Sequence, residues 1–334
     1  MESRAKRSWL GRRVTLKRAA LSAALVLGLL ATLAAAPPAQ AAKMRIAYLP
    51  VADCLSYMVA KDRGFFKKEG LEIEAQIMAG GAVQMPAIEG GSIDAGFTEA
   101  VSLLNAHSKG FDVQFIAPGA FVQLPNNSGF GWTARANDPS INSMKDLAGK
   151  TVAINVIGSI SYLGLRYQLA KAGVPLEKVK IVEIPFPQMT VPVEQGRVDV
   201  AGQVEPFVTF MVKKGTGKVI SRGNFGGLLA NRYLIGGWFS KKSWIEKNGE
   251  TARAFVRAIK GAQRYILDHP NEVPAIIAAN TKLSEDVVKG IVLSAYGTDL
   301  KPADVQPIID AAAEQKLIAK SFPASDIIAS IASQ

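Results

Sequence analysis

The sequence predicts an α/β protein with two similar lobes and a binding cleft between them. One short pattern occurs twice, as EGGSIDAG at 89–96 and as EQGRVDVA at 194–201. Each copy follows a helix-like run and leads through a short strand into polar residues and another helix. A glycine that ends a helix, before a strand whose carboxyl end faces a crevice, is typical of ligand sites in open α/β sheets. Two such modules, about a hundred residues apart, indicate two related lobes around a ligand.

Residues 1–41 have the features of a secretory signal peptide. Seven Lys and Arg side chains precede an uncharged, Ala-rich run at 19–36, and AQA at 39–41 places small residues where a signal peptidase cleaves. We therefore expect cleavage after Ala41 and export to the periplasm. The stretch GRRVTLK at 11–17 resembles a twin-arginine motif, so the export route stays open. A membrane anchor is the alternative, since about 18 apolar residues just span a bilayer.

The rest of the chain carries a modest charge and few residues suited to metals. The net charge of +11 falls to +5 without residues 1–41, and the remaining basic residues are mixed with acids. This distribution excludes the basic stripe of a nucleic-acid-binding surface. Cys54 is the only cysteine, so no intrachain disulfide can form. His107 and His269 lie far apart in the sequence, so we expect no metal site and no cofactor.

Strands and helices alternate from the start of the mature chain. Apolar or alternating runs predict strands at 44–49, 71–78, 93–97, 113–121 and 130–136. Helices are expected at 54–68, between the glycine pairs at 80–81 and 90–91, and at 100–109. A loop at 124–129 separates the last two strands. This alternation predicts a parallel sheet covered by helices.

The chain after residue 142 repeats the plan. We expect helices at 143–147, 160–172, 187–194 and 206–213, and strands at 150–154, 179–184, 198–204 and 218–221. A strand at 233–240 is then followed only by helices, at 251–268, 272–280, 284–294, 302–316 and 324–333. These helices need a sheet to bury their apolar stripes, and a return to the first sheet supplies one. We therefore expect crossovers near residues 134 and 230, with 42–133 plus 231–334 in lobe 1 and 134–230 in lobe 2.

Four loops that follow strands are candidates for the cleft, at 51–57, 98–99, 158–161 and 203–207. Gly158 and Ser159 begin a helix, where free N–H groups attract an anionic or strongly polar ligand group. Alternatively, Ser159 only caps its own helix. Glu99 and Glu205 occupy matching places in the two repeats, and either bind ligand donors or cap helices and steady the hinge. None of the four loops contains Arg or Lys, which a small inorganic anion ordinarily attracts.

The candidate binding residues come from these loops and from Phe186. Phe186 and Phe207 either form apolar walls of the ligand site or belong to the core. They are Asp53, Cys54, Tyr57, Thr98, Glu99, Gly158, Ser159, Ile160, Ser161, Phe186, Gln203, Glu205 and Phe207. Catalysis is not expected, because neither Ser159 nor Ser161 has a plausible histidine base and no glycine-rich phosphate loop is present. Glu99 with Glu205 is the one candidate carboxylate pair, at a separation that the sequence leaves open.

Several stretches resemble the periplasmic substrate-binding proteins of ABC importers, and more narrowly the group that binds sulfonates, taurine, nitrate and thiamine pyrimidines. They are AY at 47–48, KDRGFFKKEGLE at 61–72, GSIDAG at 91–96, DLAGKTVA at 146–153 and QGRVD at 195–199, and the likeness runs through nearly all of 43–334. The resemblance implies a type II periplasmic binding protein fold, in which two Rossmann-like lobes joined by a two-crossover hinge close on a solute. It also implies a monomer that delivers the solute to a permease and an ATPase at the inner membrane. In such relatives the four loops named above line the cleft.

The solute class is open between two interpretations. A sulfonate-like or carboxylate-bearing solute is expected, with its anionic end at Gly158 and Ser159, although the basic or amide group that sulfonate binders often contribute is not located here. Many relatives also carry an aromatic residue near Gln203. The alternative is a thiamine pyrimidine precursor or another neutral or amine-bearing heterocycle, because Asp53, Glu99 and Glu205 are acidic.

Two further roles compete with transport. A pyrimidine-synthase-like enzyme is one, but the synthases that resemble this group use histidine and clustered cysteines, whereas this chain has Cys54 alone. A ligand-sensing module for a membrane receptor is the other, because a receptor would dock on the same closed form.

Overall fold

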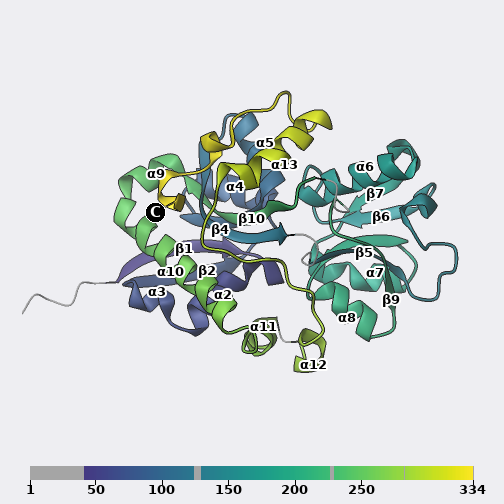
Figure 1. Cartoon of the computed structure of the whole chain (residues 1–334), viewed down its shortest axis with the longest axis horizontal. Helices are drawn as coiled ribbons and strands as arrows, with labels where there is room; N and C mark the ends of the chain where they lie inside the picture. Colours follow the sequence, from purple (N-terminus) through teal and green to yellow (C-terminus); the bar gives the residue numbers. More distant parts are fainter. Residues whose placement is uncertain (1–40, 124–128, 226–228, 282, 334) are drawn as a thin grey trace, which may run out of the picture. The chain divides into compact units, whose positions relative to one another are not determined.

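Two five-stranded sheets form the framework of the protein (Figure 1). The computed structural model describes residues 41–123, 129–225, 229–281 and 283–333. The expected signal peptide, apart from Ala41, and the loop at 124–128 therefore lie outside the described residues. The first sheet has the order β2-β1-β3-β10-β4 and comprises β1 (Ala42–Tyr48), β2 (Leu71–Ile77), β3 (Ala95–Glu99), β4 (Val113–Gln123) and β10 (Arg232–Lys241). The second has the order β7-β6-β8-β5-β9 and comprises β5 (Phe130–Arg135), β6 (Thr151–Ile154), β7 (Lys180–Glu183), β8 (Val200–Val204) and β9 (Gly217–Arg222).

Helices flank both sheets. Those before β10 are α2 (Leu55–Asp62), α3 (Phe65–Lys68), α4 (Gly81–Glu89), α5 (Ala100–Ser108), α6 (Ile160–Ala172), α7 (Thr190–Glu194) and α8 (Phe207–Lys213). Those after it are α9 (Lys242–Lys247), α10 (Gly249–Asp268), α11 (Val273–Thr281), α12 (Glu285–Val288) and α13 (Pro302–Glu314). Short 3-10 helices are η1 (Ala52–Cys54), η2 (Met144–Leu147), η3 (Leu176–Lys178), η4 (Phe186–Gln188), η5 (Ala324–Ile327) and η6 (Ser330–Ser333). In the part of the chain that is described, no helix is both long and apolar enough to span a membrane.

The two strands that cross between the halves of the chain are antiparallel to their neighbours. β5 pairs with β8 and β9 in the second sheet, and β10, green in Figure 1, returns to pair with β3 and β4 in the first. The other pairings, β1 with β2 and β3 and β6 with β7 and β8, are parallel. The prediction of purely parallel sheets is therefore wrong at β5 and β10. Strand direction depends on where a crossover strand inserts, which local periodicity does not encode.

The two sheets are built alike, with β2-β1-β3-β10-β4 matching β7-β6-β8-β5-β9 position by position. This arrangement confirms the predicted α/β class with two related halves. Strand pairing places all of β5 in the second sheet. The limits of lobe 1 (42–133 with 231–334) and of lobe 2 (134–230) stay a prediction.

The repeated sequence pattern has the same structural role in both halves. Gly91 and Gly196 each adopt φ of +70°, the left-handed conformation with which glycine ends a helix. The aspartate three residues later then ties the following strand to its parallel neighbour, β1 in the first sheet and β6 in the second. Asp94 accepts from the Arg45 backbone N–H at 2.8 Å, and Asp199 accepts from that of Thr151 at 2.7 Å. The pattern therefore helps to fix the register of β3 and β8, the two strands that lead into the centre of the molecule.

Several expected helices differ from the structure. The run at 187–194 is divided into η4 and α7. The run at 54–68 is divided into α2 and α3 because Gly64 adopts a φ of +71°. The run at 284–294 is helical only in α12, since the following residues extend and Ala295 forms an antiparallel bridge with Phe121. The run at 324–333 forms η5 and η6, between which Ile328 pairs with Phe115 of β4. In the last two cases, pairing with β4 overrides the local helical pattern.

Candidate functional site

A central cavity lies where the strands of both sheets end. It encloses about 580 Å³, part of it open to solvent. Its apolar walls are Leu49, Val51, Phe130, Val156, Ile160, Phe186, Val204 and Ile235, and its remaining lining residues are Asp53, Gly80, Gly81, Glu99, Ser102, Asn155, Ser161 and Asn224. Among the described residues, no Arg, Lys or His lines this space. A mostly apolar lining with a few polar groups is typical of a site for a small organic molecule.

Glu99 joins the two halves of the chain across the cavity. Its carboxylate caps α5, accepting from the N–H groups of Val101 at 2.8 Å and Ser102 at 2.9 Å. It also accepts from the N–H of Ile160, at the start of α6, at 3.0 Å. Burial raises the pKa of the Glu99 carboxyl to about 7, and these hydrogen bonds oppose the shift. The Glu99 carboxylate therefore accepts hydrogen bonds from the N-termini of two helices, α5 in the first half of the chain and α6 in the second.

Asp53 supplies the second carboxyl group of the cavity. It lies in η1 directly after β1, is 8% exposed, and accepts from the Ser294 hydroxyl at 2.8 Å. Burial raises its pKa to about 6; the Ser294 hydrogen bond opposes that shift, and the charge of Glu205 adds to it. Because both cavity carboxylates accept hydrogen bonds when ionised, they suit a ligand that carries donors.

Glu205 does not line the central cavity, although it occupies the place in the second repeat that Glu99 holds in the first. Its carboxylate accepts from the Thr209 N–H at 3.0 Å and from the Val292 N–H at 3.2 Å, and burial raises its pKa. Its backbone carbonyl accepts from the Ala52 N–H at 2.9 Å. Glu205 thus caps α8 and connects it to segments packed on the first sheet. Of the roles expected for it, the geometry supports helix capping and steadying of the hinge.

Protein side chains already bind the polar groups at the start of α6. Ser159 is fully buried and caps the helix, accepting from the Tyr162 N–H at 3.4 Å. The Gly158 carbonyl accepts from the Asn105 side chain at 2.7 Å. Since Glu99 already takes the Ile160 N–H, the position expected for a ligand anion holds a protein carboxylate.

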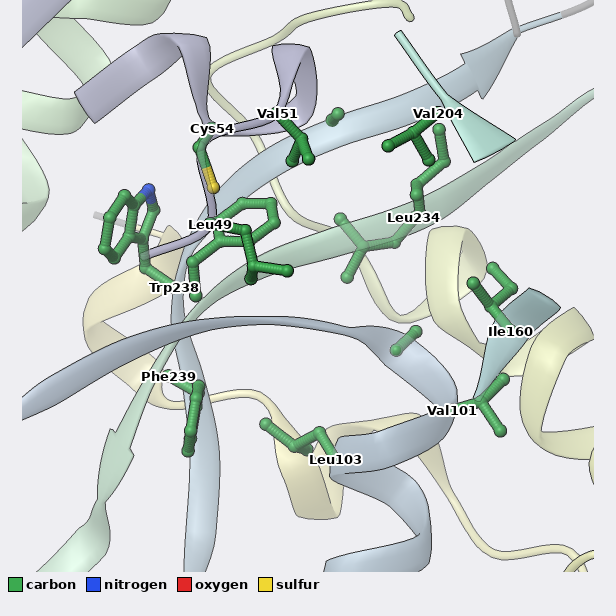
Figure 2. Close-up of a cluster of buried hydrophobic side chains, with 14 of the residues drawn as sticks. Leu49, Val51, Cys54, Val101, Leu103, Ile160, Val204, Leu234, Trp238 and Phe239 are labelled. Carbon is green, nitrogen blue, oxygen red and sulfur yellow. The ribbon is translucent and has the colours of Figure 1, made fainter. Parts of the chain in front are cut away.

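Five of the thirteen predicted residues line the cavity: Asp53, Glu99, Ile160, Ser161 and Phe186. The other eight, which do not line it, are Cys54, Tyr57, Thr98, Gly158, Ser159, Gln203, Glu205 and Phe207. Figure 2 shows Cys54 in a buried apolar cluster with Leu49 and Trp238, where burial raises the pKa of its thiol well above the usual range. Tyr57 packs against Trp238 with ring centroids 6.1 Å apart. These two side chains belong to the core of the first sheet.

The other predicted residues that do not line the cavity have equally specific surroundings. Gln203 is fully buried and donates to Thr133 at 3.4 Å and to the Met211 sulfur at 2.9 Å, away from the cavity. Thr98 is 1% exposed and lies beside Gly81, and Phe207 packs partly buried against the core. Alternation along a strand decides which side chain faces the cavity, and a shift of one residue reverses the choice. Accordingly Val204 lines the cavity where Gln203 was expected.

Several cavity residues were not among the candidates. Gly80 and Gly81 begin α4 directly after β2, so they carry the same glycine-then-helix signal as Gly158. Asn155 directly follows β6 and precedes the candidate loop at 158–161. Asn224 and Ile235 carry no local signal, because they reach the cavity through the antiparallel insertion of β5 and β10.

The two sheets and their flanking helices have the periplasmic binding protein fold. The family description "NMT1/THI5 like" matches residues 52–273, which is more than half of the chain, and the chain belongs to that family.

Known proteins with similar sequences or similar structures are consistent with this family and fold. The nitrate import ATP-binding protein NrtC of Synechocystis is 26% identical over 253 residues; these cover 68% of this chain but only 36% of that longer protein. The alkanesulfonate-binding protein SsuA of Xanthomonas axonopodis has a TM-score of 0.73 at 19% identity, with 88% of this chain and 99% of SsuA covered. The periplasmic nitrate-binding protein NrtA of Synechocystis has a TM-score of 0.68 at 18% identity, with 85% of this chain and 84% of NrtA covered. An enzyme, the desulfurization enzyme DSZB, shares the fold with a TM-score of 0.61 at 16% identity, with 86% and 96% covered.

Proposed function

We propose that this protein is the exported solute-binding component of an ABC import system. It captures a small organic solute in the central cavity, closes around it by hinge motion, and delivers it to a permease and an ATPase at the inner membrane. The observation that carries the proposal is a cavity that residues of both sheets line and that the Glu99 hydrogen bond to Ile160 spans. Export through the segment at 1–41 and action as a monomer in the periplasm belong to the same proposal.

The polar groups of the cavity favour a neutral or amine-bearing solute over a sulfonate. Asp53 and Glu99 are carboxylic acids, and no Arg, Lys or His accompanies them in the described lining. A buried anion beside two carboxylates would lack the cation that ordinarily compensates its loss of hydration. Nitrate and alkanesulfonate, named for two of the similar proteins, are both anions. We therefore place this chain with the second of the two expected solute classes.

A thermal-shift panel tests the proposal. Purified mature protein is screened against aminoheterocycles, neutral amides, alkanesulfonates, carboxylates and nitrate at a fixed pH. A solute present at a hundredfold excess over its Kd stabilises the folded protein by about 2.7 kcal/mol, which raises the melting temperature by several degrees. We expect such a rise with amine-bearing or neutral solutes. A panel in which only nitrate or sulfonates raise the melting temperature would overturn the solute class, and a panel without any rise would overturn the binding function.

A further inference from the structure

Asn224 is a buried residue that lines the central cavity, and its side-chain nitrogen Nδ2 has no hydrogen-bond partner among the described residues. It follows β9, is 1% exposed, and lines the cavity from the second sheet. Five other described residues also carry a buried polar side-chain atom without a partner, but none of those five lines the cavity.

The main chain of Asn224 is nevertheless held firmly in place by α6. Gln168 donates to the Asn224 carbonyl at 2.9 Å and to the preceding Gly223 carbonyl at 2.8 Å. Gly164 lets the helix approach so closely that a Cβ there would lie 2.4 Å from the Asn224 carbonyl oxygen. A fixed backbone with an unsatisfied amide at a cavity wall is the arrangement expected of a preorganised ligand donor.

The Asn224 side chain offers a donor, which the two ionised carboxyl groups do not. Asp53 and Glu99 accept hydrogen bonds, whereas the Asn224 Nδ2 group donates. A solute that satisfies all three therefore carries a donor group and, elsewhere on an apolar body, an acceptor. Because no cation lines the described part of the cavity, that acceptor is neutral.

We infer that Asn224 is a specificity-determining residue, whose side-chain amide donates to a neutral carbonyl oxygen or ring nitrogen of the bound solute. Together with the carboxyl groups, it selects amides and amino-substituted nitrogen heterocycles over amines that lack an acceptor. This inference rests on the proposed function, because it names the solute class of the same cavity.

Matched probe pairs and two variants test the inference. The probes are aminopyrimidine with aniline and aminomethylpyridine with benzylamine, whose members differ in a ring-nitrogen acceptor, and benzenesulfonate as an anion. The variants are Asn224→Leu, which removes the donor at similar volume, and Gln84→Leu, which removes another buried amide with unpartnered atoms outside the cavity. Affinities come from calorimetry and melting temperatures from fluorimetry.

The wild type is expected to bind the acceptor-bearing member of a pair about tenfold more tightly, which is the effect of one hydrogen bond. Asn224→Leu should abolish that preference without lowering the melting temperature of the free protein, whereas Gln84→Leu should keep the preference. Equal binding of both members by the wild type, or a preference that survives in Asn224→Leu, would overturn the role of Asn224. A large fall in the melting temperature of Asn224→Leu would assign the residue to folding instead. A wild type that binds none of the probes would instead count against the proposed solute class.

Discussion

Asp53 and Glu99 are buried carboxylic acids of the cavity, and burial disfavours their ionised forms. Each has donors from the protein: a serine hydroxyl for Asp53, and three backbone N–H groups for Glu99. Those donors do not fully offset the loss of water, since the pKa values of both groups are raised. Buried carboxyl groups with raised pKa values concentrate at functional sites. Further donors from a solute would stabilise their ionised forms.

The raised pKa values predict that stability falls as the pH rises. Between the unfolded pKa, near 4, and the folded values of about 6 for Asp53 and about 7 for Glu99, the folded protein binds more protons than the unfolded chain. The free energy of unfolding should therefore decrease between pH 5 and pH 8. Asp53→Asn should make this decrease smaller, because it removes the titration of Asp53. That titration contributes at most about 3 kcal/mol to the free energy of unfolding. Urea unfolding at several pH values measures both proteins. A wild-type stability that rises with pH over this range would contradict the assignment.

At the scale of the elements, the start of α4 depends on the absence of a side chain at Gly81. A Cβ there would lie 2.5 Å from the Ser102 Cβ and 2.7 Å from the Thr98 hydroxyl oxygen, so α4 packs directly on α5. Gly80 and Gly81 also line the cavity. The close approach of the two helices therefore shapes the binding space as well as the first lobe.

Substitution of Gly81 should separate the two helices. We expect Gly81→Ala to lower the free energy of unfolding by about 1–3 kcal/mol, because the backbone must move to admit the methyl group. Solute affinity should fall with it. Gly90→Ala, at the other end of the same helix, is the control, since its Cβ would meet only the Pro86 carbonyl at 3.3 Å. Chemical denaturation and calorimetry report the two effects. Equal losses in both variants would show that the contact with α5 has no special importance.

Local patterns in the sequence predict the elements that local interactions build. The helix expected at 160–172 matches α6 (Ile160–Ala172), since Ser159 caps its start and Gly173 ends it at a φ of +73°. The glycines and aspartates of the repeated pattern likewise place β3 and β8. The repeat also singles out Glu99, which lines the cavity, but it gives no sign of the contact between Glu99 and Ile160.

Features that depend on distant partners were not predictable from local patterns. The residues after α12 have a helical pattern in the sequence. The bridge between Ala295 and Phe121 overrides that pattern, and it joins positions more than 170 residues apart in the chain. Asn224 reaches the cavity only because β5 inserts between β8 and β9. Likewise, Cys54 and Tyr57 occupy a suitable loop and helix, but their side chains face the core.

The two halves of the molecule meet across the cavity through few polar contacts. Glu99 binds the Ile160 N–H, and Asn105 donates to the Gly158 carbonyl at 2.7 Å. Both contacts join α5 of the first half to the start of α6 in the second. In the proposed hinge motion, these two contacts are placed to stabilise the closed form.

Removal of the Asn105 contact should shift the protein toward open conformations. We expect Asn105→Ala to increase the radius of gyration of the free protein in small-angle scattering and to weaken solute binding about fivefold or more, as loss of one hydrogen bond would. Asn280→Ala is the control, because the Asn280 amide donates at 2.9 Å to the Ile276 carbonyl within its own helix. An Asn105→Ala protein as compact as the wild type, with unchanged affinity, would contradict this role.

The central claim is that the cavity between the two sheets holds the solute. Ser161 is 2% exposed and lines that cavity, so Ser161→Trp fills the space with a large side chain. Calorimetric titration of both proteins with a solute that stabilises the wild type tests the claim most directly. We predict one-to-one binding by the wild type and no measurable binding by a folded Ser161→Trp protein. Undiminished binding by that variant would contradict the account.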